Sequence, residues 1–165
     1  MGKSINWLVR WAIVVSVLLQ LSGAESRRSL SAPSYYVAVE ARTCMPGEVK
    51  FRGISNLPMG AIVILSVVDF NDAAWKPYSD EVHESVRLDG SFEGKIEAKK
   101  NTLFHGNLLL HVVFMPSEAR QPDSVLKVVG KKGQNLGGLD NPQVGQMSGE
   151  NYYLEVIARA YCGER

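Results

Sequence analysis

The three histidines are the first residues to consider as metal ligands or general bases. Metal ligation needs two or three of them to converge, yet the spacing of His83, His105 and His111 matches no metal-binding motif. His83 lies on the polar face of an alternating segment, close to Glu81 and Glu84, whereas His111 lies within an apolar segment. We therefore expect two surface histidines, one partly buried histidine, and neither a bound metal nor a cofactor.

Nucleophilic catalysis has little support in the pattern of serines. None of them lies in the Gly-x-Ser-x-Gly setting that presents a hydrolase nucleophile on a sharp turn. A serine, a histidine and an acid can nevertheless meet in space without any fixed spacing in sequence. The sequence thus favours a protein that is not an enzyme, with a small periplasmic hydrolase or metal-binding protein as the alternative.

A glycine-rich segment, 130–138, contains Lys131 and Lys132 and invites a phosphate-binding interpretation. The P-loop spacing G-x-x-x-x-G-K-[ST] is absent, and no strand leads into the segment. A helix that ends here and is followed by a turn is the better interpretation.

The two cysteines are expected to form a disulfide. Cys44 follows the first alternating segment and Cys162 follows the last, and a disulfide needs Cα atoms within about 7 Å of each other. The first and last strands should therefore lie side by side and parallel, as in immunoglobulin-like sandwiches. Two buried free thiols are the alternative, while two cysteines without a nearby histidine make a poor metal site.

One aromatic segment, 70–78, is the candidate for partner binding. It follows the most apolar segment of the chain, and tryptophan and tyrosine are enriched at binding hot spots. Alternatively, its tryptophan folds back over the end of the core. The candidate partner-binding residues are Phe70, Trp75, Lys76 and Tyr78.

The elements that position these residues are strands, because apolar and polar residues alternate with a period of two. We expect an all-β, immunoglobulin-like sandwich of about seven antiparallel strands. Asp89-Gly90, between two alternating segments, predicts a hairpin. The alternating or apolar segments are 37–42, 49–53, 61–68, 82–88, 92–97, 108–114 and 154–161.

Two segments depart from this alternation. Residues 121–130 predict one short helix that begins near Pro122 and Asp123, ends at Gly130 or Gly133, and covers an open end of the sandwich. Residues 135–149 are rich in Gly, Asn and Gln and are expected to form a long loop.

The N-terminal residues predict a secretory signal peptide, 1–24. Lys3 and Arg10 precede an apolar segment, 11–21, which spans only about 16 Å as a helix, against a hydrocarbon core of about 30 Å. Ser22-Gly23-Ala24 then supplies the small residues of a cleavage site after Ala24. We expect a flexible lead-in over 25–33 and a β-sandwich domain over 34–165, with an uncleaved membrane anchor as the alternative.

Asn56-Leu57-Pro58 and Gln121-Pro122, with the spaced residues that follow, resemble segments of small exported bacterial β-sandwich proteins. This resemblance implies the fold and brings no active site with it. The spaced residues are Val125, Gly130, Gly133, Leu136 and Gly138.

Composition narrows the classes of partner. The chain has 165 residues and a net charge of +1, which favours neither nucleic acid nor an anionic membrane surface. We therefore expect a periplasmic or secreted, non-catalytic binding protein, whose partner is another envelope or secreted protein engaged through loops or a sheet edge. A membrane-anchored structural subunit that retains the leader is a further alternative.

Overall fold

The computed structural model describes residues 34–69, 79–100, 102–117, 120–137 and 141–163. They form an all-β sandwich of two antiparallel sheets with one short helix, α2 (Asp123–Val129). The first sheet has the order β1 (Val37–Met45), β2 (Glu48–Ser55), β5 (Ser91–Glu97). The second has the order β4 (Val82–Ser85), β3 (Ile62–Asp69), β6 (Gly106–Phe114), β8 (Asn151–Cys162), β7 (Val144–Met147).

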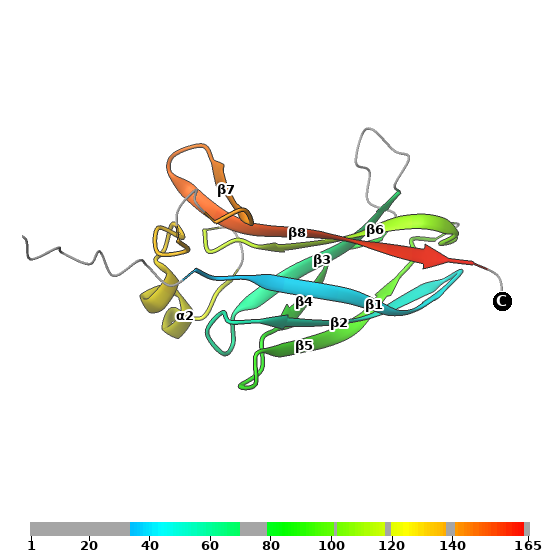
Figure 1. The fold of residues 1–165 in the computed structure, drawn as a ribbon, viewed down its shortest axis with the longest axis horizontal. Coiled ribbons are helices and arrows are strands. Elements are labelled where there is room, and N and C mark those ends of the chain that lie inside the picture. The colour runs from blue at the N-terminus through cyan, green and yellow to red at the C-terminus, as the bar shows by residue number, and fades with distance from the viewer. Residues whose placement is uncertain (1–33, 70–78, 101, 118–119, 138–140, 164–165) are drawn as a thin grey trace, which may run out of the picture. The chain divides into compact units, whose positions relative to one another are not determined.

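This strand order is that of an immunoglobulin-like sandwich. The first sheet corresponds to strands A, B and E, and strands β4, β3, β6 and β8 correspond to C′, C, F and G. The first and last of these, β1 and β8, run side by side in the same direction (Figure 1). The fold class and the adjacency of the first and last strands are therefore as the sequence predicted.

The core lies between the two sheets and follows the predicted alternation. In β2, Val49 and Phe51 are buried while Lys50 and Arg52 are exposed. Helix α2 adds Val125 and Val129 to the core at one end of the sandwich and ends at Gly130, as expected. The largest fully buried side chains include Phe92, Phe104 and Phe114.

Two glutamine side chains take the place of missing strand neighbours. The Gln121 carboxamide accepts a hydrogen bond from Ile62 N at 2.8 Å and donates one to Ile62 O at 2.7 Å. The Gln143 carboxamide does the same for Val37, at 2.9 and 2.8 Å. Each carboxamide thus completes the edge of a strand as a paired backbone would, because it offers one donor and one acceptor.

The prediction of a long loop over 135–149 is partly wrong, because this segment contains a strand that was not predicted, β7. This strand has four residues, and it pairs with β8 from Val144 opposite Leu154 to Met147 opposite Asn151. A glycine and a glutamine within so short a strand obscure any alternation, so its formation depends on the edge that β8 offers.

The hairpin predicted at Asp89-Gly90 is also wrong in its pairing. The turn forms, with Arg87 N donating to Ser91 O at 2.8 Å. The strands on its two sides enter different sheets, however, and β5 pairs with β2 instead of β4. Leu88 lies in this turn and is 86% exposed, so it does not continue the strand that contains Val82.

Gly53 should tolerate substitution far less well than Gly47. A Cβ atom at Gly53 would lie 2.0 Å from the ring of Phe92, the residue opposite it on β5, whereas one at Gly47 would meet nothing within 4 Å. We expect Gly53→Ala to lower the free energy of unfolding by about 1 to 3 kcal/mol, the usual cost of overpacking. Urea denaturation of both alanine variants measures this, and equal midpoints would contradict it.

Candidate interaction surface

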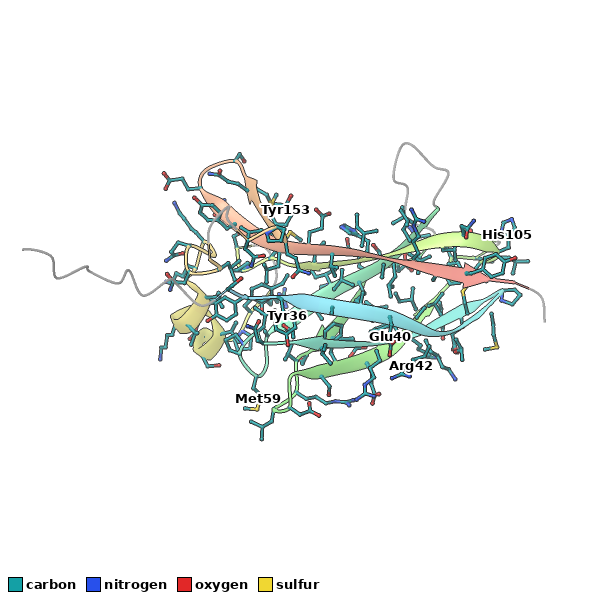
Figure 2. All side chains as sticks on the ribbon, in the orientation of Figure 1. Tyr36, Glu40, Arg42, Met59, His105 and Tyr153 are labelled. Atoms are coloured by element: carbon teal, nitrogen blue, oxygen red, sulfur yellow. A yellow bond between two sulfur atoms is a disulfide. The ribbon has the colours of Figure 1, made fainter. Side chains whose placement is uncertain are left out.

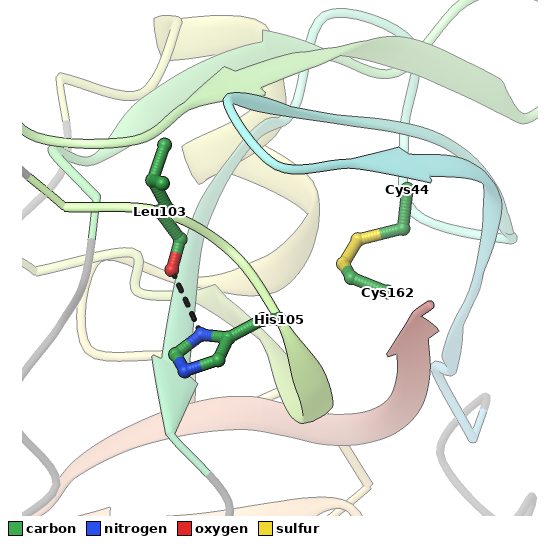
Figure 3. Close-up of a disulfide and its surroundings, with 4 residues drawn as sticks. All are labelled: Cys44, Leu103, His105 and Cys162. Atoms are coloured by element: carbon green, nitrogen blue, oxygen red, sulfur yellow. Dashed lines mark hydrogen bonds between the residues drawn. A yellow bond between two sulfur atoms is a disulfide. The ribbon is translucent and has the colours of Figure 1, made fainter. Parts of the chain in front are cut away.

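The disulfide Cys44–Cys162 holds together one end of the sandwich, with its Cα atoms 4.9 Å apart. The bond joins the end of β1 to the end of β8, which confirms the predicted pairing (Figure 3). Nearby, Phe104 N donates to Pro46 O at 2.6 Å, and His105 Nδ1 donates to Leu103 O at 3.2 Å. We call residues 45–47, 103–105 and 161–163 the disulfide end.

Three large apolar side chains at the disulfide end are exposed. Tyr161 is 70% exposed, Leu103 is 64% exposed and Met45 is 50% exposed. Single exposed apolar residues are ordinary, but a group of them at one place on a surface marks an interaction site. The backbone that carries this group is held by the disulfide.

Two surface hollows of about 680 and 970 Å³ flank Tyr161 and share Pro46, Tyr161 and Gly163 in their walls. The smaller is also lined by Leu103 and His105. The larger is lined by three cationic side chains, and no carboxylate from the described part of the chain lines either hollow. The cationic residues are Arg42, Lys50 and Arg159.

A β-bulge brings Arg42 to the larger hollow. The register between β1 and β2 shifts between Ala41 and Thr43, which leaves Arg42 as the extra residue. Bulges redirect side chains at sheet edges. The guanidinium of Arg42 also lies 2.9 Å from Glu40 Oε1, an exposed ion pair that contributes little stability and leaves the cation accessible. Figure 2 shows Arg42 and Glu40 on the ribbon, with His105 at the disulfide end.

The outer face of the first sheet carries further ion pairs, as Arg42 and Lys50 of the hollow are themselves paired with Glu40 and Glu48. Lys95 lies 2.7 Å from Glu97, and Arg87 lies 2.9 Å from Glu93. The hydrogen bond from Lys95 lowers the pKa of the Glu97 carboxyl and raises the pKa of the Lys95 ammonium. These pairs leave this face with little net charge.

His111 and Glu155 form the closest approach of titratable groups on the second sheet, with Nε2 2.6 Å from Oε1. Ser66 is the direct cross-strand partner of His111, on the same outer face of the sheet. Ser66, His111 and Glu155 line a third hollow of about 290 Å³, together with Glu81 and otherwise mostly apolar side chains. The sequence offered no signal for this meeting, because the three residues lie on three different strands.

This arrangement lacks features that serine catalysis uses. Ser66 lies within β3, whose backbone pairs with β6, so it is not at the strained turn of a nucleophile elbow. His111 uses Nε2 for its hydrogen bond with Glu155. In the triad template the acid instead takes Nδ1 and the serine takes Nε2.

The other candidate residues fall into two groups. Within the described ranges, no three His, Cys, Asp or Glu side chains are arranged to hold a metal ion, and His83 and His105 are exposed. The predicted partner-binding residues Phe70, Trp75, Lys76 and Tyr78 lie outside the described residues.

Sequence reasoning missed the disulfide end as a surface. Met45 is the last residue of β1 and Leu103 lies in the irregular segment before β6, so neither belongs to an alternating pattern in the sequence. Tyr161 occupies a polar-face position of the last alternating segment, next to Cys162. A large aromatic side chain at an outward position beside a disulfide was the one signal available.

Of the helices in the described part of the chain, none has the length and apolar character needed to cross a membrane. No protein-family model matches this chain, and no curated protein is significantly similar to it in sequence.

Proposed function

We propose that this chain is an exported, non-catalytic binding protein that engages another envelope or secreted protein through one end of its sandwich. Three exposed apolar side chains around one disulfide, Met45, Leu103 and Tyr161, carry this proposal. Covering exposed apolar side chains with a partner lowers the free energy of the complex. Because the disulfide already fixes the backbone here, binding costs little backbone conformational entropy.

Export is supported by two independent features. The N-terminal residues have the three regions of a signal peptide, and a bond between Cys44 and Cys162 is compatible with an oxidising compartment. The segment 70–78 stays a second candidate surface on the grounds of its aromatic residues.

The double variant Leu103→Ala with Tyr161→Ala should lose partner capture and keep its stability. Both side chains are mostly exposed, so we expect the free energy of unfolding to stay within about 0.5 kcal/mol of wild type for each change. Affinity capture from the native envelope, followed by mass spectrometry, should then recover fewer partner molecules than the wild-type chain does.

Leu88→Ala with Met59→Ala is the matched control, because both side chains are exposed and neither residue belongs to the disulfide end. It should capture the same proteins as wild type. Equal capture by both double variants would contradict the disulfide end as the binding surface, and capture of nothing by the wild-type chain would contradict the proposed function.

A further inference from the structure

The end of the sandwich opposite the disulfide carries exposed apolar side chains on two adjacent turns. Met59 lies in the turn after β2 and is 61% exposed, and Leu88 lies in the turn before β5 and is 86% exposed. Tyr36, just before β1, and Ile54, in β2, are also exposed, and Figure 2 labels Tyr36 and Met59. The name N-terminal end is used below for residues 34–36, 54–60 and 87–90.

Hydrogen bonds hold the parts of the N-terminal end together. Ser55 donates from its backbone N to Gly90 O at 2.8 Å and from Oγ to Tyr36 O at 2.7 Å. Gly60 N donates to Val86 O at 2.8 Å, which fixes the first turn against the segment that leads into the second. The exposed side chains are therefore carried by a fixed backbone, so covering them costs little conformational entropy.

The apolar surface continues from the turns onto the outer face of the first sheet. Ala38 lies directly opposite Ile54, and Tyr36 precedes Ala38 by two residues, so the three side chains share this face. Single exposed apolar residues are ordinary, whereas several of them at one end of a domain mark a protein or membrane interaction site.

The described chain begins at this same end. Asn56, which directly follows β2, donates from Nδ2 to Ser34 O at 3.0 Å. Residues 22–33 connect Ser34 to the apolar segment of the predicted leader, 11–21, and such a connection spans at most about 45 Å. A leader inserted in the bilayer during export therefore brings the N-terminal end within reach of lipid. The disulfide end lies at the other end of β1, nine residues or about 30 Å away (Figure 1).

The charges beside the second turn favour apolar contact over attraction to anionic lipid. Arg87 is paired with Glu93 at 2.9 Å. Asp89 accepts hydrogen bonds from Ser91 N and Oγ at 2.9 and 2.7 Å, and these bonds lower the pKa of the Asp89 carboxyl. A carboxylate next to Leu88 disfavours an anionic surface, so the lipid that fits this end is zwitterionic.

We propose that the N-terminal end rests on a lipid bilayer, with Met59 and Leu88 inserted at the boundary between headgroups and acyl chains. Tyr36 then lies at the level of the headgroups, where an aromatic ring with a hydroxyl group suits both environments. The membrane surface is separate from the surface of the proposed function, and it leaves the disulfide end free to meet a partner protein.

Co-sedimentation with phosphatidylcholine vesicles tests this surface. The protein to use is the chain that begins at Glu25, after the predicted cleavage site, because the compact unit Ala32–Arg165 lies wholly within it. The chain should sediment with the vesicles. High salt should not lower the bound fraction, because salt screens attraction between charges and leaves apolar contact intact.

Leu88→Ser with Met59→Ser should lower the vesicle partition coefficient about tenfold or more, because two apolar side chains no longer enter the bilayer. Ile157→Ser with Met147→Ser is the matched control. It also replaces two exposed apolar side chains, but on β8 and β7, outside both named ends, and should leave the partition coefficient unchanged. Circular dichroism confirms that both variants are folded.

Four results would overturn the membrane surface. These are a chain that stays in the supernatant, equal loss of binding in the two serine variants, binding of phosphatidylglycerol vesicles alone that high salt reverses, and a dimer in analytical ultracentrifugation that needs Met59 and Leu88. Partner capture decides the proposed function separately. If vesicle binding fails while Leu103→Ala with Tyr161→Ala still loses partner capture, the proposed function stands without the membrane surface.

Discussion

Replacing Cys44 with serine should lower the free energy of unfolding by about 2 to 5 kcal/mol, the usual cost of losing a native disulfide from a small secreted domain. The bond joins residues separated by 118 positions, so it removes much conformational entropy from the unfolded chain. It also holds Tyr161 and Met45 in place, so the variant should bind partner less well even where it remains folded.

Urea denaturation measures this effect, and reduction supplies its control. The wild-type chain with a thiol reductant should show the same loss in the free energy of unfolding as Cys44→Ser does. The reductant should not change the free energy of unfolding of the variant. An unchanged midpoint for Cys44→Ser would contradict the expected contribution of the bond. Two alkylatable thiols in the exported protein would contradict the bond itself.

Gln121→Leu should lower the free energy of unfolding by about 2 to 4 kcal/mol. The leucine keeps the volume but leaves Ile62 N and Ile62 O without their partners, and each part-buried unpaired group costs about 1 to 3 kcal/mol. Gln146→Leu is the matched control, because Gln146 is exposed in β7, and it should change stability by less than about 0.5 kcal/mol. Similar losses in both variants would show that the carboxamide bonds contribute nothing.

Gln121→Glu separates hydrogen bonding from packing by its dependence on pH. A carboxylate still accepts from Ile62 N but faces Ile62 O without a proton to donate, so the pKa of the introduced carboxyl should be raised in the folded state. The stabilising contribution of the protonated form is then complete below the unfolded pKa and is lost as the pH rises through the folded pKa. Stability closer to wild type at acid pH than at neutral pH is the expected result.

The sequence was sufficient for the fold class because the sheets bury one face each. Val49 and Phe51 alternate with lysine and arginine, and this period of two fits a half-buried strand and does not fit a helix. The disulfide followed from the same strands, since Cys44 and Cys162 each end one. The helix followed from Pro122 at its start and Gly130 at its end.

The parts that could not be predicted depend on contacts distant in sequence. Strand β7 forms on an edge of β8, and Gln121 and Gln143 act as strand neighbours only once the sheets are assembled. The Asp89-Gly90 turn has the local chemistry of a hairpin, but which sheet each flanking strand joins is decided by β2 and β3. The candidate surface could not be predicted for the same reason, because Met45, Leu103 and Tyr161 come together only around the disulfide.

The contacts that join β1 to Gln143 and to Cys162 can form only late in the synthesis and folding of the chain. Because the chain is synthesised from its N-terminus, all strands of the first sheet are present once Glu97 has been added, whereas β8 is the last strand to be synthesised. The contacts of β1 with Gln143 and with Cys162 span 106 and 118 residues, and such distant contacts form slowly. Until they form, the edge of β1 is open to wrong neighbours and Cys44 to wrong thiols. The bond between Cys44 and Cys162, which forms when an external oxidant accepts two electrons from the two thiols, can therefore close only after the last strand has been synthesised and placed beside β1.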